Sequence, residues 1–189
     1  MDAVMKELSY TTEDIFALPE GERAELIDGQ IYYMATPNRI HQKIVMSLSN
    51  KIFNYIQSKG GDCEVYPAPF AVFLNCDNKN YVEPDVSVIC DPDKLTDKGC
   101  NGAPDWVIEV VSGSSRNMDY LRKLVKYQTS GVREYWIVDP EKKKVAVYDF
   151  ENGELPVSYT FDDMVPLRIS EGKCSVDFSV INKAVSRFD

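Results

Sequence analysis

Long apolar segments are missing from this sequence of 189 residues. No run of eighteen apolar residues occurs, which argues against a transmembrane helix. The first ten residues, MDAVMKELSY, lack the apolar centre of a secretory signal peptide. We therefore expect a cytoplasmic protein that has no membrane partner.

Cysteine and histidine are also scarce. The cysteines are five in number and stand at Cys63, Cys76, Cys90, Cys100 and Cys174, with no Cys-x-x-Cys spacing. An odd number in this arrangement argues against a disulfide framework and against a structural zinc site. We expect the thiols to be reduced, as they are in a cytoplasm.

Basic residues are fewer than acidic ones, 21 against 30, which gives a net charge of −9. Such a chain does not resemble a general nucleic-acid binder, because DNA affinity depends on cations that contact phosphates. It either avoids polyanions or meets them through a local basic patch and a metal. The 44% hydrophobic content is sufficient for one folded domain over residues 1–189.

Common catalytic motifs are missing as well. The chain has no Gly-x-Gly-x-x-Gly and no Walker A loop, which argues against the usual nucleotide-binding folds. Ser112, Ser114 and Ser115 have neither a Gly-x-Ser-x-Gly setting nor a nearby His–Asp pair. Serine hydrolase chemistry is therefore not expected.

The order of apolar patterns predicts an α/β fold. Asp28-Gly29 is a hairpin-turn signal between two apolar runs, and Gly60 and Gly131 stop two amphipathic segments. The expected helices are 12–18, 38–59 and 116–130, with a short one near the C-terminus, and the expected strands include 62–74, 80–90, 105–112, 133–140 and 144–150. This order predicts a central mixed β-sheet with a helix on each face.

Two of the expected core strands each contain an acid. Asp85 lies in YVEPDVSVIC, residues 81–90, and Glu109 lies in APDWVIEVVS, residues 103–112. A carboxylate inside an apolar strand is costly unless it has a partner. Alternation along the strand places Glu109 on the face of Val107 and Val111. On neighbouring strands the two carboxylates would converge, and the cation between them would be Mg²⁺ or Mn²⁺.

A simpler explanation applies to each acid alone, since such residues often lie at a sheet edge or pair with arginine. The helix that follows adds to the constellation. Asp119, Lys123 and Tyr127 share one face of it. The helix is also locally basic, with Arg116, Arg122, Lys123 and Lys126. It is either a solvated, salt-bridged face or a phosphate-facing patch beside a metal.

Longer runs of the sequence resemble a known family. Residues 103–140, residues 18–45 and the segment VEPDVSVI are similar to the Uma-type putative restriction endonuclease family of the PD-(D/E)XK nuclease superfamily. The resemblance covers about residues 10 to 180. It implies a restriction-endonuclease-like core and Mg²⁺-dependent hydrolysis of phosphodiester bonds, most naturally in DNA.

The resemblance also implies roles for particular residues. Asp85 corresponds to the first acid and Glu109 to the second, and these residues with the Val110 backbone carbonyl would hold Mg²⁺ or Mn²⁺. Glu25 is an additional acid of the site. The strand position that should carry lysine is Val111, and the family places its lysine on the following helix, at Lys123. A smaller departure is Gly113, where proline is common.

The remaining expectations concern the surroundings of these residues. His41 is a capping or surface group, or it lines the same cleft as Glu25, with Asp119 and Tyr127 as further secondary residues. Lys123 should lean over the sheet toward Glu109, while Lys126 should be more exposed. The alternative to a nuclease is a catalytically silent module of the same fold that binds nucleic acid or protein. A homodimer would suit double-strand cleavage.

Overall fold

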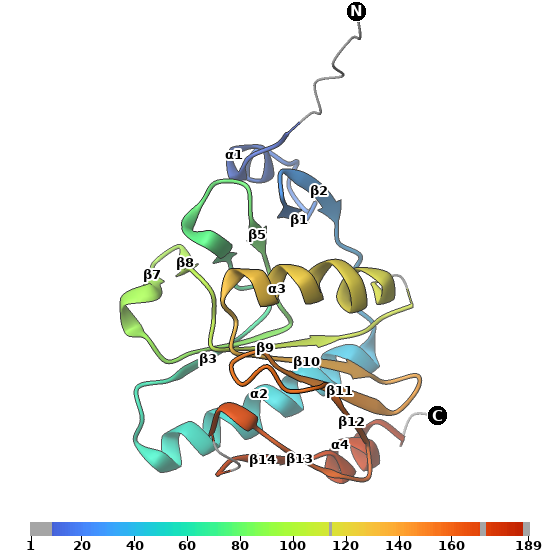
Figure 1. Cartoon of the computed structure of the whole chain (residues 1–189). Helices are drawn as coiled ribbons and strands as arrows, with labels where there is room; N and C mark the ends of the chain where they lie inside the picture. The colour runs from blue at the N-terminus through green and yellow to red at the C-terminus, as the bar shows by residue number, and fades with distance from the viewer. Residues whose placement is uncertain (1–8, 114, 171–172, 187–189) are drawn as a thin grey trace, which may run out of the picture.

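The computed structural model describes residues 9–113, 115–170 and 173–186. Most of the N-terminal segment used for the signal-peptide prediction, residues 1–8, lies outside them. No helix in the described ranges combines the length and apolar character needed to span a bilayer. The chain forms two six-stranded sheets with a helix layer between them and another below (Figure 1).

The central sheet is mixed, as the sequence predicts. Its order is β12-β11-β10-β9-β6-β3, in which only β9 and β10 among neighbours run parallel. The strands are β3 (Glu64–Pro67), β6 (Val86–Ile89), β9 (Trp106–Val110), β10 (Glu134–Asp139), β11 (Lys144–Asp149) and β12 (Val157–Thr160). Because β6 pairs directly with β9, the predicted neighbourhood of the strands near Asp85 and Glu109 is confirmed.

The second sheet was not predicted. Its order is β2-β1-β5-β4-β8-β7, and it lies above the central sheet in Figure 1. The strands are β1 (Ala24–Ile27), β2 (Gln30–Tyr33), β4 (Val72–Phe73), β5 (Tyr81–Val82), β7 (Leu95–Thr96) and β8 (Gly99–Asn101). The last two lie between the expected strands 80–90 and 105–112, where no strand was predicted.

Prolines explain why the predicted strands 62–74 and 80–90 are divided. Pro67 ends β3 and the cis bond Ala68–Pro69 follows, while Pro84 separates β5 from β6. Proline cannot donate a ladder hydrogen bond, so it interrupts pairing. The outer halves of both strands pair in the central sheet and the inner halves pair in the second sheet.

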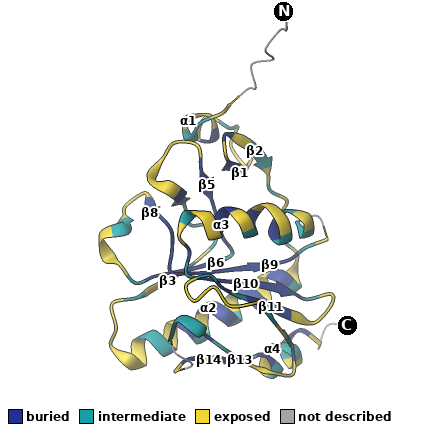
Figure 2. Ribbon diagram, in the orientation of Figure 1, coloured by how far each residue is buried: buried dark blue, intermediate teal, exposed yellow. Residues whose placement is uncertain are grey.

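The helices cover the central sheet on both faces. Helix α2 (Arg39–Lys59) begins at the Asn38 cap and ends at Gly60, as predicted, and packs on the lower face. The upper face carries the helix predicted at 116–130. It is divided into a π-helical segment η3 (Met118–Lys123) and α3 (Leu124–Ser130). The strands are buried between these layers (Figure 2).

Smaller elements complete the chain. Asp28 and Gly29 have φ of 51° and 76° and form the predicted turn between β1 and β2. The predicted helices near both ends are present. The remaining elements are α1 (Thr12–Phe16), η1 (Leu74–Cys76), η2 (Pro92–Lys94), β13 (Met164–Pro166), η4 (Arg168–Ser170), β14 (Ser175–Asp177) and α4 (Phe178–Val185).

The expectation that all five cysteines are reduced is wrong for one pair. A disulfide joins Cys63 to Cys90. These residues flank the paired positions Glu64 and Ile89, so the antiparallel register of β3 and β6 makes them cross-strand neighbours. Their separation of 27 residues carries no sign of this pairing.

The second sheet can be tested through Gly99, which has φ of +131° in β8. An added Cβ would lie 2.2 Å from the Ala71 carbonyl oxygen, which accepts the Cys100 N–H. The control is Gly21→Ala. Gly21 has φ of +89° and open space around it, so this variant measures backbone strain alone, about 1–2 kcal/mol. Gly99→Ala adds the clash with the Ala71 carbonyl. It should therefore lower the free energy of unfolding, measured in urea, by about 1–3 kcal/mol more than Gly21→Ala does. Equal losses would contradict the close approach of β8 to β4.

Candidate active site

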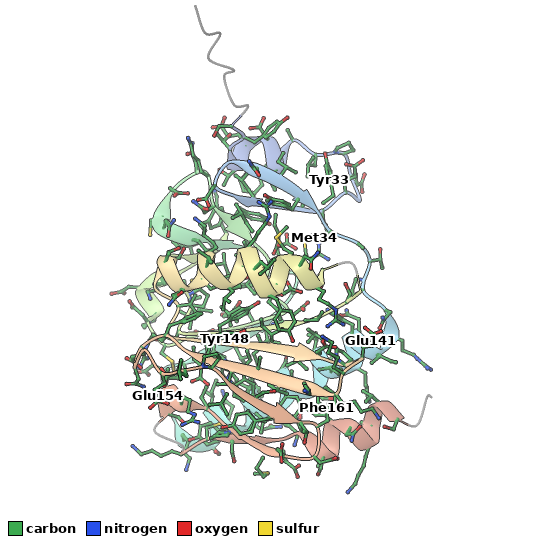
Figure 3. The ribbon with its side chains drawn as sticks, turned by 45° about the vertical axis from the view of Figure 1, so that its right-hand side comes forward. Tyr33, Met34, Glu141, Tyr148, Glu154 and Phe161 are labelled. Carbon is green, nitrogen blue, oxygen red and sulfur yellow. A yellow bond between two sulfur atoms is a disulfide. The ribbon has the colours of Figure 1, made fainter. Side chains whose placement is uncertain are left out.

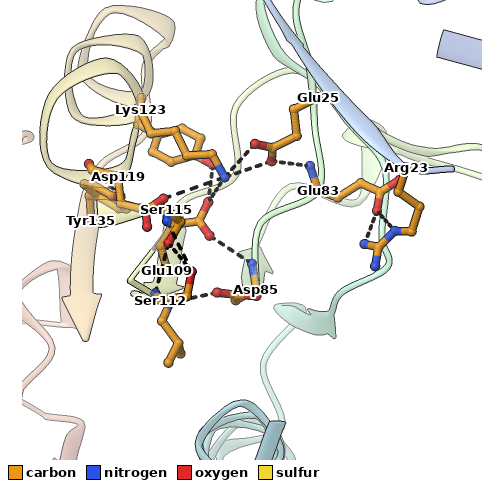
Figure 4. Close-up of polar contacts among 12 residues, drawn as sticks. Arg23, Glu25, Glu83, Asp85, Glu109, Ser112, Ser115, Asp119, Lys123 and Tyr135 are labelled. Atoms are coloured by element: carbon orange, nitrogen blue, oxygen red, sulfur yellow. Dashed lines mark hydrogen bonds and ion pairs between the residues drawn. The ribbon is translucent and has the colours of Figure 1, made fainter. Parts of the chain in front are cut away.

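A lysine lies between two buried acids at the interface of the two sheets. The Lys123 ammonium is 2.8 Å from a Glu25 carboxylate oxygen and 2.9 Å from Glu109 Oε1 (Figure 4). Glu25, Glu109 and Lys123 expose 3%, 4% and 5% of their surfaces. The predicted approach of Lys123 to Glu109 is therefore confirmed.

Three elements position this group. Glu25 is on β1, Glu109 is on β9 and points to the α3 side as predicted, and Lys123 ends the π-helical segment η3. Tyr127, in the next turn, donates its hydroxyl to Glu109 Oε1 at 2.6 Å. π-helical turns are rare and are frequent at functional sites. Here the turn carries Asp119 and Lys123 into the space above Glu109.

Asp85 lies beside Glu109, immediately before β6. Its Oδ2 accepts the Val110 N–H at 2.7 Å, and its own N–H is 3.4 Å from Glu109 Oε2. The two acids are therefore neighbours in one cavity, as predicted, and a metal ion shared between them stays a prediction. Pro84 leaves the chain free of a ladder bond at this point, so Asp85 can turn toward the end of β9.

His41 is neither exposed nor a helix cap. It is 8% exposed, in the first turn of α2, and its Nε2 is 3.0 Å from Asp85 Oδ2. Burial alone would lower the pKa of His41, but the bond to Asp85, its charge and a contact with the Val110 carbonyl together raise that pKa. The true cap is Asn38, whose side chain accepts the His41 N–H.

The electrostatics of the cluster are dominated by burial. Burial raises the pKa of Glu109 well above its usual value, although the Lys123 charge opposes this. Burial would lower the pKa of Lys123, but Glu109, Glu25 and Asp119 raise it overall, which keeps the ammonium charged. Burial also raises the pKa of Asp119 to about 6. Asp119 Oδ2 is a buried oxygen with no hydrogen-bond partner among the described residues.

These groups share one cavity of about 810 Å³. Its charged lining consists of Glu25, Asp85, Glu109 and Asp119 against Arg23 and Lys123. The sequence did not point to the rest of the wall. That wall comes from the connection between β2 and α2 and from Ala68, Pro69, Ser112, Ser115 and Met118. Most of these residues are small or apolar, so no acid or base marked them.

Similar proteins identify the family of this chain. Residues 12–172 match the family described as "Uma2: Putative restriction endonuclease". The chain belongs to the Uma2 family. It is 30% identical over 150 residues to the uncharacterized protein slr1290 of Synechocystis sp., covering 78% of this chain and 77% of that protein. A second Synechocystis protein, sll1609, is 26% identical over 121 residues, covering 62% and 67%.

A solved structure has the same fold. It is the crystal structure of a putative nuclease belonging to DUF820 from Anabaena variabilis, with a TM-score of 0.76. The match covers 93% of this chain and 98% of that chain at 18% sequence identity. The likeness confirms that this Uma2 chain has the predicted fold.

The donor atoms fit a hard divalent cation. No group of three or more His, Cys, Asp and Glu side chains within the described ranges is arranged to hold a metal. Mg²⁺, however, is commonly bound by one or two carboxylates and completed by water. Asp85 uses Oδ2 for its bonds to Val110 and His41, and Glu109 uses Oε1 for its bonds to Lys123 and Tyr127. Among the residues that the structure describes, Glu109 Oε2 accepts only the long bond from the Asp85 N–H at 3.4 Å, so this oxygen and Asp85 Oδ1 are the candidates for binding a cation.

The basic side chains of the helix mostly have partners within the protein. Arg116 pairs with Asp139 and Glu141, and Arg122 donates to the Tyr32 hydroxyl at 2.6 Å. Lys126 pairs with Asp28 and is 8% exposed against 5% for Lys123, so it is the more exposed lysine by a small margin only, and both are buried. The β1–β2 hairpin contacts one side of the helix through these pairs, while Leu121 and Val125 are 63% and 58% exposed. Contact of this patch with DNA stays a prediction.

The pKa of Asp119 predicts a pH dependence of stability. The pKa of Asp119 in the folded protein, about 6, exceeds its ordinary value of 3.8. Protonated Asp119 therefore contributes to the free energy of unfolding at low pH, and this contribution is lost as pH rises from about 4 to 6. Asp119→Asn does not titrate there. Its free energy of unfolding in urea should therefore rise relative to wild type between pH 4 and 7, by about 3 kcal/mol.

Asp163→Asn is the matched control. Asp163 is exposed, and the Thr160 N–H and hydroxyl lower its pKa. The ionised Asp163 carboxylate therefore adds to the free energy of unfolding above its ordinary pKa, and this contribution is lost as pH falls. Asp163→Asn lacks it, so this variant should become less stable relative to wild type as pH rises. The same slope in both variants would contradict the buried setting of Asp119.

Proposed function

We propose that this Uma2 protein is a nuclease that hydrolyses phosphodiester bonds with Mg²⁺ or Mn²⁺, and that DNA is its substrate. The observation that carries the proposal is the charge of the cavity, where four carboxylates face two cationic side chains. A phosphate is repelled from such a site unless a divalent cation compensates. The family description supports the same reaction class, as does the likeness to the Anabaena protein, itself described as a putative nuclease.

In this proposal Asp85, Glu109 and the Val110 carbonyl hold the cation. When bound, it supplies an acidified water and neutralises charge on the phosphate. In hydrolysis the water oxygen bonds to phosphorus, the bond to the leaving sugar oxygen breaks, and a proton passes from the water to that oxygen. Lys123 lies where its ammonium can donate to a phosphate oxygen.

The other residues act by holding these groups in place. Glu25 shares the Lys123 ammonium with Glu109, and its other contact is with the Glu83 N–H at 3.0 Å. Tyr127 fixes Glu109 through its hydroxyl, and His41 fixes Asp85. These hydrogen bonds fix Glu109 Oε1 and Asp85 Oδ2, and both carboxylates line the cavity.

A second candidate is a catalytically silent module that binds nucleic acid or protein. The observation that favours it is the full engagement of Lys123 by Glu25 and Glu109, together with the net charge of −9. Such a module would not require a divalent cation. Homodimerisation and a cytoplasmic location stay predictions.

The decisive experiment is a titration of Mg²⁺ and of Mn²⁺ with labelled single-stranded, double-stranded and structured DNA. We expect cleavage that requires the cation and that falls by about 100-fold or more in Asp85→Asn, since loss of mere supporting residues already costs about 10–100-fold. Asp93→Asn, an exposed loop acid, should cleave normally. Cleavage in EDTA, or no cleavage by wild type on any substrate, would refute the metal-dependent nuclease.

Lys123→Met tests the ammonium. We expect this variant to lose cleavage and also to lower the free energy of unfolding by about 3–5 kcal/mol, because two buried carboxylates lose their cation. This differs from a purely catalytic lysine, whose loss would leave melting unchanged. Adding Glu25→Gln removes one negative charge and should restore much of the stability but not the cleavage.

Lys126→Met is the control for that experiment. Its partner Asp28 has a side chain that is 70% exposed, so water can solvate the carboxylate that is left. Stability and cleavage should both stay near wild type. If Lys126→Met and Lys123→Met lose cleavage equally, the assignment of Lys123 is wrong.

A further inference from the structure

The depth of the reacting groups limits which nucleic acids can reach them. Glu109 and Lys123 are 4% and 5% exposed, and Asp119 is 2% exposed. Glu109 is on β9, and Asp119 and Lys123 are on η3. The helix that begins with η3 lies below the β1–β2 hairpin in Figure 1. A phosphate must therefore leave the bulk solvent and enter the cavity. A flexible single strand can enter such a cavity more easily than a duplex, whose two strands hold the phosphate backbone on the outside of a wide, stiff helix.

One wall of the cavity is a single extended segment. After β2 the chain runs through Met34, Ala35, Thr36 and Pro37 to Asn38, the cap of α2, and each of these residues lines the cavity. The Met34 N–H donates to the Arg23 carbonyl, which fixes the start of the segment to β1. The segment itself offers apolar surface, one hydroxyl and the Asn38 side chain, and the neighbouring Arg23 is paired with Glu83. This side therefore suits nucleobases better than a row of phosphates.

Tyr33 stands at the upper end of this segment. Its surface is 67% exposed although it also lines the cavity. Figure 3 places Tyr33 beside the hairpin and Met34 nearer to the helix. The preceding Tyr32 differs, because the Arg122 guanidinium already lies over its ring, 5.3 Å from the ring centroid. An exposed aromatic ring at the rim of such a cavity is a platform on which an unpaired base can stack.

The charges also disfavour a duplex. Duplex binding draws most of its affinity from several lysine and arginine contacts to phosphates. In this protein Arg116, Arg122 and Lys126 on the helix have partners within the chain, and the net charge is −9. Binding by base stacking depends less on such contacts.

We infer that the substrate is a single-stranded nucleic acid, or an unpaired end, which passes along residues 33–38 with a base stacked on Tyr33. This inference rests on the proposed function and adds the form of the substrate to it. The unpaired strand delivers one phosphate to Asp85 and Glu109 without any loss of base pairing. The geometry does not require deoxyribose, so DNA and RNA are both tested.

The test uses one labelled 20-nucleotide sequence as single-stranded DNA, single-stranded RNA, blunt duplex and duplex with an unpaired tail. Binding is followed by fluorescence anisotropy and cleavage by gel, both with Mn²⁺. We expect single strands and tails to be bound and cut in preference to the blunt duplex. Tyr33→Ala should weaken single-strand binding by about 5- to 150-fold, which corresponds to the loss of one stacked base.

Two variants serve as controls. Tyr33→Phe keeps the ring and should bind like wild type. Phe53→Ala removes another exposed aromatic, 51% exposed on α2, and should change nothing. Blunt duplex bound and cut as well as single strands, or normal single-strand binding by Tyr33→Ala, would overturn the inference.

The two proposals fail in different ways. Efficient metal-dependent cleavage of duplex alone would keep the nuclease and reject the single-strand substrate. Single-strand binding that depends on Tyr33, without cleavage under any condition, would support the substrate form and reject the nuclease. Absence of both binding and cleavage would reject both proposals.

Discussion

The Lys123 ammonium, held between Glu25 and Glu109, is the interaction on which the rest of the molecule depends. It joins β1 of the second sheet to β9 of the central sheet through the helix segment between them. Without the ammonium between them, the buried carboxylates of Glu25 and Glu109 would repel one another. This repulsion would favour their protonated forms. The ion cluster therefore fixes the spacing of the two sheets and, with it, the cavity.

The cavity still has more negative than positive charge after this pairing. Asp119 keeps a buried oxygen without a hydrogen bond, and Asp85 and Glu109 each keep one oxygen outside their main contacts. Buried carboxylates are stable only when protonated or compensated. A purely structural cluster gains stability from complete pairing, and the surplus here is the charge that the proposed cation would compensate.

The β1–β2 hairpin has two effects. It supplies Glu25, and it contacts the helix whose basic residues had suggested a phosphate-binding face. Asp28 and Tyr32 bind Lys126 and Arg122, so the apparent basic patch becomes part of the packing between hairpin and helix. Among the described lysines and arginines only Lys123 and Lys126 are buried, and each of them pairs with an acid of this hairpin.

The sequence alone determined the central layer of this Uma2 protein. Long apolar periodicities, the Asn38 and Gly60 helix limits and the acids next to β6 and within β9 are local signals, because each depends on residues a few positions apart. The second sheet was decided by tertiary structure. Its strands of two to four residues are too short to show a period, and prolines assign the halves of longer apolar runs to different sheets. Contacts such as Cys63 with Cys90 and Lys126 with Asp28 join residues 27 and 98 positions apart. Only the register of paired strands and the packing of the hairpin on the helix bring such residues together.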